Sequence, residues 1–391
     1  MNRHRLWITL LSGCAALVLA ACGAGEADPA TTPLKIAVVA PFDEKHVALG
    51  DSSRNGVVLA VEEWNQRGGV LGRSIQVVLK DSQCDYIAGR EAAQAALNDG
   101  ANFIIGGVCS NESEGIAQVV MESDALQIIH AATHPDLVFD NDGLMRERVF
   151  RVPFSDPVQG TAAAQFALER LQAKTAAILT LEGDDYGTML STAFQTAFEA
   201  GKGDIARHEV YELGADDLYK ILEKIRDENA DVLYMPGYYN GIASLVMQAR
   251  SFGLLQPVLG SDGWNSSNLN LSNINDCYFT THYFAGESRP AVQTWIQNYE
   301  TRYMIAPDTL ATLAYDTTNM LLAGIQEARS LDPAHVAKAL KSMTFETITG
   351  RVTFDENHNA VKDVLILKVQ NGQLLLEERF VVKDIAEEDT P

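Results

Sequence analysis

The chain has 391 residues, of which 47% are hydrophobic and 21% are charged, and its formal net charge is −22 at pH 7. Because an acidic surface repels nucleic acids and anionic lipid head groups, this charge argues against both as partners. A globular part of about 360 residues predicts two domains of ordinary size, and acidity spread over both halves is typical of a solvated surface.

The first residues have the layout of a secretory signal. Arg3 and Arg5 precede an apolar run over residues 6–19, and small residues follow it. This run is shorter than the roughly 20 residues that a membrane-spanning helix needs. We therefore predict that residues 1–21 are a signal peptide that is removed, and that no other segment spans a membrane.

The signal ends in Leu19-Ala20-Ala21-Cys22, which resembles the lipobox of bacterial lipoproteins. In such proteins the cysteine is diacylated and becomes the first residue of the mature chain. The resemblance implies lipid attachment at Cys22, and the polar stretch 22–33 is predicted to be a flexible tether. The plainer alternative is an ordinary signal peptide with an incidental cysteine.

Short β-branched runs alternate with amphipathic helical stretches along most of the chain. We expect strands at 34–40, 75–81, 103–106, 176–181, 231–236 and 258–260, and helices at 52–66, 88–98, from Ser113, at 291–303 and at 310–326. Alternation of this kind predicts an α/β fold in which parallel sheets are covered by helices on both faces.

Three extended stretches interrupt this alternation, and we interpret them as crossings between two lobes. They lie at 149–154, 277–283 and 350–355, and Pro153 disfavours a helix just before it. The predicted first lobe comprises 34–152 and 282–350, the second comprises 153–281 and 351–382, and 383–391 form an acidic tail. The prediction is thus two discontinuous lobes joined by three hinge strands.

The cysteines that remain after Cys14 leaves with the signal and Cys22 carries lipid are Cys84, Cys109 and Cys277. Export would place them in an oxidising space, where one pair can form a disulfide. Cys84 and Cys109 each follow a predicted strand, so they would lie within bridging range at one sheet edge if those strands are neighbours. Cys277 would then be a buried free thiol.

Several motifs, in register along the chain, resemble the leucine/isoleucine/valine-binding proteins of branched-chain amino acid ABC transporters. They are Leu34-Lys-Ile-Ala-Val-Val-Ala-Pro41, Asn65-Gln-Arg-Gly-Gly-Val-Leu-Gly72, Asp81-Ser-Gln-Cys-Asp85, Ile105-Gly-Gly-Val-Cys-Ser110, Ala131-Ala-Thr-His-Pro135, Asp185-Tyr-Gly187 and Gly237-Tyr-Tyr239. The resemblance covers residues 34 to 380 and implies the two-lobed type I periplasmic binding fold, which closes over its ligand. It also implies a disulfide between Cys84 and Cys109.

Polar and aromatic residues after predicted strand ends are candidates for a binding site, because ligands of open α/β sheets lie at the carboxyl ends of the strands. The candidates are Ser110, Ala131, Thr133, Tyr186, Tyr238 and Asp262. Free backbone N–H groups and a helix dipole near Ser110 can bind an anion. The resemblance implies that Ser110, Ala131 and Thr133 hold the carboxylate and part of the ammonium of an amino acid. It further implies that Asp262 accepts the ammonium where the family carries a glutamate.

Each candidate also has a plainer explanation. Asn111 and Glu114 could form an ordinary helix cap, and the other candidates could lie in surface turns. The acid at Asp262 is shorter than the family's glutamate, and Leu49 and Leu310 stand where the family often carries aromatic residues. These departures indicate a modified side-chain pocket.

Catalytic alternatives have little support in the sequence. His130 and His134 have the spacing of metal ligands, but they bracket a predicted strand end and Pro135 follows, which argues against one helical face. Cys109 next to Ser110 lacks the Gly-x-Ser-x-Gly turn of a nucleophile, and no glycine-rich nucleotide motif is present. We expect no enzyme activity, no metal and no cofactor.

The resemblance implies a monomeric solute-binding lipoprotein of an ABC transporter, anchored through Cys22 at the periplasmic face of a bacterial membrane. Its expected ligand is a small amino acid, branched-chain or related, which the chain would deliver to a permease. Two alternatives remain open at this point. One is a sensory subunit that reports the ligand instead of delivering it, and the other is a receptor for a small carboxylate or amide that is not an amino acid.

Overall fold

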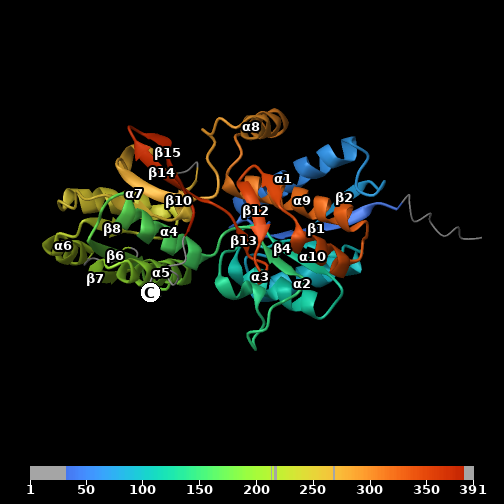
Figure 1. Cartoon of the computed structure of the whole chain (residues 1–391), viewed down its shortest axis with the longest axis horizontal. Helices are drawn as coiled ribbons and strands as arrows, with labels where there is room; N and C mark the ends of the chain where they lie inside the picture. Colours follow the sequence, from blue (N-terminus) through green and yellow to red (C-terminus); the bar gives the residue numbers. More distant parts are fainter. Residues whose placement is uncertain (1–31, 213, 215–217, 267–268, 383–391) are drawn as a thin grey trace, which may run out of the picture.

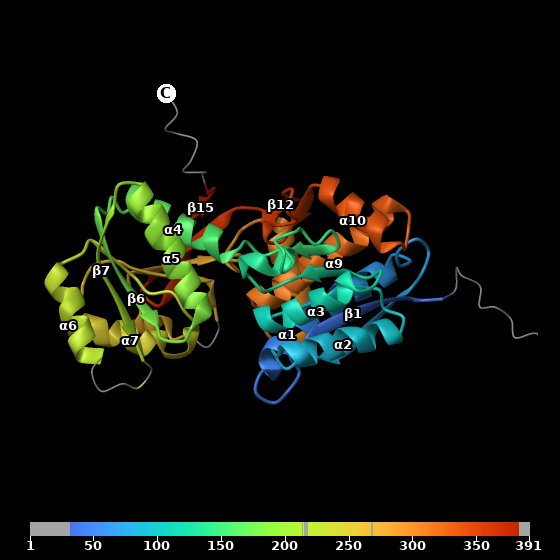
Figure 2. The same ribbon diagram turned by 90° about the horizontal axis from the view of Figure 1, so that it is seen from below.

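The computed structural model describes residues 32–212, 214, 218–266 and 269–382, which form two lobes side by side (Figures 1 and 2). The predicted signal peptide, Cys22 and the acidic tail lie outside the described residues. No helix within the described part of the chain is both long enough and apolar enough to cross a membrane.

The first lobe contains a sheet of five parallel strands. In chain order these are β1 (Leu34–Ala40), β2 (Ile75–Asp81), β3 (Phe103–Ile105), β4 (Leu126–Ile129) and β5 (Val149–Arg151), and their order in the sheet is β2-β1-β3-β4-β5. Alternate residues of β1 enter opposite cores: Ile36 and Val38 face one, and Ala37 and Val39 face the other. Burial on both faces explains why this strand is almost entirely apolar.

Helices cover both faces of this sheet. The helices α1 (Val47–Gln66) and α9 (Thr309–Ala328) pack together on one face, and α2 (Tyr86–Asn98) and α3 (Ser110–Met121) pack together on the other. The first lobe is completed by the 3-10 turn η1 (Pro135–Val138), α8 (Pro290–Tyr303), α10 (Pro333–Ser342) and a small antiparallel sheet of β11 (Phe345–Thr347), β12 (Gly350–Phe354) and β13 (Ala360–Val361).

The second lobe contains a sheet of seven strands in the order β15-β14-β10-β9-β8-β6-β7. They are β6 (Thr175–Leu181), β7 (Asp204–Tyr211), β8 (Val232–Tyr234), β9 (Val258–Gly260), β10 (Cys277–Thr281), β14 (Val364–Gln370) and β15 (Gln373–Phe380), and only the pairs β10–β14 and β14–β15 are antiparallel. The helices α4 (Asp156–Glu169) and α5 (Asp185–Ala200) cover one face, and α6 (Leu218–Glu228) and α7 (Tyr239–Ser251) cover the other.

The chain crosses between the lobes after β5, after β10 and after β13. The prediction for the third crossing was wrong, because residues 350–355 hold β12, which belongs to the first lobe. Val352 and Phe354 are buried in the first-lobe core, where the Phe354 ring meets that of Phe150 edge-on at 5.0 Å. The crossing therefore follows β13. The strands β12 and β13 belong to the first lobe, although the prediction assigned residues 351–382 to the second lobe.

The predicted disulfide between Cys84 and Cys109 is confirmed, with 5.3 Å between the two Cα atoms. The strand argument behind it was wrong, because β1 lies between β2 and β3 in the sheet. Two strands that flank a third are about 9.5 Å apart, so the loops after β2 and β3 must converge beyond the end of β1. Cys277 is a free thiol and is buried in β10.

Replacing both bridged cysteines, Cys84→Ser with Cys109→Ser, should lower the free energy of unfolding by about 3 kcal/mol. The reason is that the bridge closes a loop with a sequence separation of 25 and restricts the unfolded chain. Urea denaturation of the variant and of the wild type measures the difference. A reductant should lower the wild-type value to that of the variant and leave the variant unchanged; equal stability of the two unreduced proteins would contradict the prediction.

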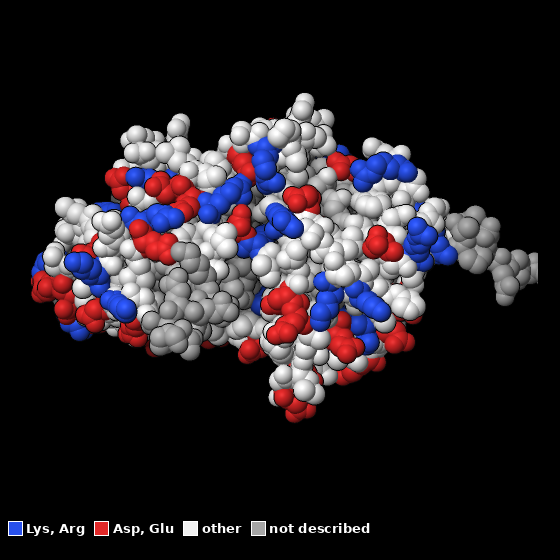
Figure 3. Space-filling view, in the orientation of Figure 1, with Lys and Arg blue, Asp and Glu red and all other residues white. Residues whose placement is uncertain are grey.

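The charged side chains on the face shown in Figure 3 are intermixed, with acidic and basic residues close together on both lobes. Ion pairs at the surface of the described chain include Arg170 with Glu378 and Arg90 with Glu122. On this face the excess of acid is therefore distributed as a solvated surface, and it does not gather into one patch.

Candidate functional site

The six candidate residues all lie beside one cavity between the lobes, with a volume of about 1790 Å³. The first lobe contributes Ser110 at the start of α3, and Ala131 and Thr133 after β4; the second contributes Tyr186 after β6, Tyr238 after β8 and Asp262 after β9. The structure thus brings together the ends of five strands from two sheets. Leu49 and Leu310 line the same cavity from the first lobe.

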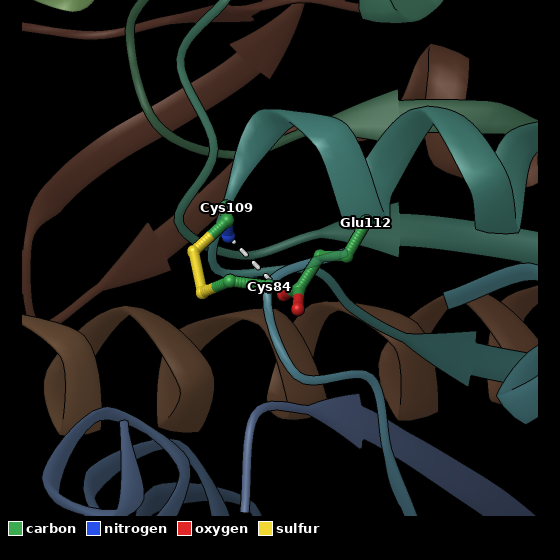
Figure 4. Close-up of side chains that lie close together, drawn as sticks. All are labelled: Cys84, Cys109 and Glu112. Atoms are coloured by element: carbon green, nitrogen blue, oxygen red, sulfur yellow. Dashed lines mark hydrogen bonds between the residues drawn. A yellow bond between two sulfur atoms is a disulfide. The ribbon is translucent and has the colours of Figure 1, made fainter. Parts of the chain in front are cut away.

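The first-lobe wall is built around the N-terminus of α3. The side chain of Glu112, which is fully buried, accepts hydrogen bonds from the backbone N–H of Val108 and of Cys109 and from the Ser82 hydroxyl. Figure 4 shows Glu112 reaching back to Cys109 beside the disulfide. Glu112 thus occupies the N–H groups before the helix, whereas the N–H groups of Ser110 and Asn111 in the first turn of α3 have no partner within the helix, and both residues line the cavity.

This arrangement rules out the alternative in which Asn111 and Glu114 form an ordinary helix cap. The N-cap position is Cys109, the acid that reaches back is Glu112, and Glu114 instead makes a bidentate ion pair with the buried guanidinium of Arg146. Burial raises the pKa of Glu112, and the hydrogen bonds that it accepts oppose this effect. Hydrogen bonds to side chains inside the first lobe therefore fix the start of α3.

The segment after β4 is held by the first crossing. The carbonyl oxygen of Thr133 accepts hydrogen bonds from the backbone N–H of Asp156 and from Nη1 of Arg151, both at 3.1 Å. Arg151, which is 1% exposed, also donates to the carbonyl of His134. Thr133 is thus fixed relative to both lobes at the point where the chain passes between them.

Two tyrosines and an aspartate form the second-lobe wall. The rings of Tyr186 and Tyr238 stack with 4.9 Å between their centroids, and Tyr238 is 52% exposed. The Tyr186 hydroxyl donates to Oδ1 of Asp262 and accepts a hydrogen bond from the backbone N–H of Gly263 at 3.2 Å. An exposed aromatic face beside a carboxylate is suited to contact with a cationic group.

Asp262 is held by residues that the sequence analysis missed. Gln159 donates from Nε2 to Oδ1 of Asp262 at 2.9 Å and accepts from its backbone N–H at 2.7 Å, and Nε2 of His282 lies 3.3 Å from Oδ2. Burial by itself raises the pKa of Asp262, but the contacts from His282, Tyr186 and Gln159 outweigh it, so the pKa lies below its ordinary value. Asp262 is therefore ionised at neutral pH.

His282 is neutral beside this carboxylate. Burial lowers its pKa to about 4, and its ring stacks on that of Phe154 with 3.6 Å between centroids. Phe154 follows the first crossing and His282 follows the second, so the stack joins two hinge segments next to the cavity. No local pattern indicates Gln159 or His282 in the sequence, because each contacts Asp262 from a distant position in the chain and only the fold brings them together.

The two histidines with metal-ligand spacing have separate surroundings. His130 is fully buried, its Nε2 lies 2.8 Å from the Ser53 hydroxyl, and burial lowers its pKa to about 4. His134 accepts a hydrogen bond from the backbone N–H of Asp136 at 3.3 Å. Within the described ranges, the side chains clustered closely enough to hold a metal are Cys84, Cys109 and Glu112, and the disulfide occupies both sulfur atoms.

Two lobes joined by three crossings, with a cavity lined from both, are the architecture of a two-lobed solute-binding protein. The model of a family described as periplasmic binding protein matches residues 33–373. The chain belongs to this family, and the fold class predicted from the sequence is confirmed.

Its relatives and structural neighbours agree with this assignment. The chain is 28% identical over 340 residues to the leucine-, isoleucine-, valine-, threonine- and alanine-binding protein of Pseudomonas aeruginosa, covering 86% of this chain and 90% of that protein. It is 28% identical to the Leu/Ile/Val-binding protein of Escherichia coli, covering 89% and 92%. The crystal structure of a leucine binding protein from Thermotoga maritima matches with a TM-score of 0.76 and 30% identity, covering 88% of this chain and 98% of that one.

Proposed function

We propose that the chain is the solute-binding component of an ABC transporter and that it captures an amino acid between its lobes. The proposal is supported by relatives whose names state that they bind leucine, isoleucine and valine, and by a branched-chain amino acid transporter binding protein of Streptococcus pneumoniae. The structure of that protein contains isoleucine and matches with a TM-score of 0.78 and 25% identity, covering 90% of this chain and all of that one.

The observation that carries the proposal is the pairing of opposite charges across the cavity. The N-terminus of α3 offers N–H groups and the positive end of a helix dipole beside Ser110, and the opposite lobe offers the ionised carboxylate of Asp262. An amino acid zwitterion carries an anion and a cation on the same carbon atom. It would therefore contact both lobes at once and hold them closed.

Calorimetric titration with the twenty common amino acids tests ligand capture directly. We expect at least one of them to bind, and mass spectrometry of the small molecule released on unfolding should identify an amino acid that co-purified. Matching deaminated acids should bind more weakly than the amino acids. A protein that binds none of the twenty, or that prefers the deaminated acids, would contradict the proposal.

The proposed partner of the ligand-bound monomer is a membrane permease. Deleting the gene should abolish uptake of the labelled amino acid that binds in calorimetry, because the permease would then lack its ligand-loaded partner. Uptake that persists at the wild-type rate, together with an altered transcriptional response to that amino acid, would instead support a sensory role.

We also propose attachment to the periplasmic face of a membrane through lipid on Cys22. Cys22→Ala should give unprocessed precursor or soluble protein, since the variant has no thiol to which lipid can be attached. Fractionation and detergent partitioning of cells expressing either protein measure this. Normal processing and membrane retention of the variant would contradict lipid attachment, and Cys277→Ala is the matched control that should remain lipidated.

A further inference from the structure

Asn265 makes a hydrogen bond that joins the two lobes directly. It follows Trp264, which is buried in the second-lobe core, and its Nδ2 donates to Oγ1 of Thr309 at 2.8 Å. Thr309 is the first residue of α9 in the first lobe and lies 44 positions further along the chain. Both residues line the cavity, so the lobes touch within its wall.

The acceptor of this hydrogen bond is fixed within the first lobe. Asp308, the N-cap of α9, accepts hydrogen bonds from the backbone N–H of Ala311 at 2.8 Å and from the Ser52 hydroxyl of α1. The start of α9 is thus tied to α1, against which α9 also packs. Thr309 therefore moves with the first lobe.

The donor is fixed at the second crossing. Nδ2 of Asn265 also donates to Oγ1 of Thr281 at 2.6 Å and to the carbonyl oxygen of Tyr283 at 3.2 Å. Thr281 is fully buried at the end of β10, and Tyr283 follows it where the chain passes to the first lobe. An ordinary role for Asn265 would be to satisfy these two acceptors. That role does not require Thr309, because an amide nitrogen has two N–H donors and these acceptors could use both.

The lobes stand apart across the cavity. Its volume of about 1790 Å³ exceeds the roughly 300–1,000 Å³ of a pocket that encloses a small ligand, and Tyr238 in its second-lobe wall is 52% exposed. Capture therefore requires the lobes to turn toward each other. At Asn265 and Thr309 they cannot come closer, because 2.8 Å already lies within the range of about 2.7–3.2 Å for an N–H···O hydrogen bond.

We propose that Asn265 and Thr309 form a pivot about which the lobes close. The inference rests on the proposed function for the solute that fills the cavity. The hydrogen bond is kept in the empty and in the closed form, and it limits the empty protein to lobe angles from which closure brings the two walls into register. A site that is ordered in advance loses less conformational entropy on binding. Asn265 is thus a positioning residue, which acts through the lobes and needs no contact with the solute.

Calorimetry on the mature chain tests the pivot, with L-leucine and the other nineteen common amino acids as probes. Thr309→Val removes the acceptor and keeps the shape of the side chain. It should weaken binding of the tightest probe about two- to tenfold, the effect of one neutral hydrogen bond. Thr309→Ser keeps the hydroxyl and should restore the wild-type affinity. The matched control is Thr196→Val, which removes an exposed hydroxyl from α5 and should leave the affinity unchanged.

A second variant shows whether the two residues act through one contact. Asn265→Ala should weaken binding at least as much as Thr309→Val, because it also removes the donor to Thr281. In the Asn265→Ala protein, Thr309→Val should have no further effect on affinity. Losses that add would mean that the two residues act separately, and they would overturn the inference. A fraction of protein that fails to fold lowers the binding stoichiometry and leaves the affinity of the folded remainder measurable.

Small-angle X-ray scattering of the ligand-free proteins tests the pivot without a solute. Thr309→Val should populate a wider range of lobe separations than the wild type, and Thr309→Ser should not. A scattering profile of Thr309→Val identical to that of the wild type overturns the pivot, and so does an unchanged affinity in calorimetry. A wild type that binds none of the twenty probes overturns amino acid capture, and the scattering comparison then still decides whether the pivot exists.

Discussion

Asp262→Asn should weaken binding of the preferred amino acid by a factor of roughly ten to a hundred or more. The side chain keeps its shape but loses the charge that faces the ammonium, and a hydrogen bond to a charged group contributes about 1.5–3 kcal/mol. Its polar partners Tyr186, Gln159 and His282 remain, so the variant should fold. Calorimetric titration of both proteins measures the loss.

A deaminated acid provides the control for this prediction. The wild type should bind the deaminated form of its preferred amino acid much more weakly than the amino acid itself, and the variant should discriminate less between the two. Equal affinity of variant and wild type for the amino acid would show that Asp262 does not read an ammonium. The empty variant should not melt higher than the empty wild type at pH 7: a carboxyl whose pKa is lowered in the folded state stabilises that state above its unfolded pKa.

Three strands have the bounds that the sequence predicted. β1, β2 and β9 have the predicted bounds, because each is a short apolar or alternating run followed by a polar turn. The helix expected at 52–66 begins at Val47. The sequence did not indicate this earlier start, because the residues before Ser52 carry no clear apolar stripe and several of them line the cavity. Local periodicity therefore located the elements better than their ends.

The third crossing could not be located from the hydrophobic periodicity of the sequence. β12 alternates buried and exposed residues as any half-buried strand does, and this pattern is the same whichever core receives the buried face. Which core receives Val352 and Phe354 depends on a partner distant in sequence, Phe150 of β5. The contact between Gln159 and Asp262 could not be predicted for the same reason. Gln159 lies 103 residues before Asp262, and the two meet only because α4 packs beside the end of β9.

The candidate site itself could be predicted because parallel strands place their carboxyl ends at one edge of each sheet. This rule selected residues from five strand ends, and all six line one cavity. It could not select Gln159, which lies in α4 directly after a crossing and follows no strand of the second-lobe sheet. A glutamine on a helix is common in sequences, and only its contact with Asp262 distinguishes this one.

Arg151→Met should lower the free energy of unfolding by about 3–5 kcal/mol, because it removes a buried charged donor and leaves buried acceptors unsatisfied, at a cost of about 1–3 kcal/mol each. Arg151 is 1% exposed at the end of β5 and donates to the carbonyls of Thr133 and His134 and to the side chain of Asn359. Asn359 lies in the first lobe just before the third crossing. Methionine would fill much of the space but leave the carbonyl of His134 and the amide of Asn359 without this donor.

The comparison that tests this argument is Arg170→Met, which removes an arginine of equal hydrogen-bonding ability from the surface. Arg170 also makes a bidentate contact, with both hydrogen bonds to Glu378 at 2.6 Å, but its side chain is 48% exposed. An exposed pair contributes at most about 1 kcal/mol, because water replaces what the partner supplied. Urea denaturation should therefore show a much larger loss for Arg151→Met, and a loss no greater than that of Arg170→Met would mean that the crossing does not depend on this guanidinium. Amino acid binding should also weaken in Arg151→Met and not in Arg170→Met, since of these two arginines Arg151 is the one that donates to Thr133 beside the cavity.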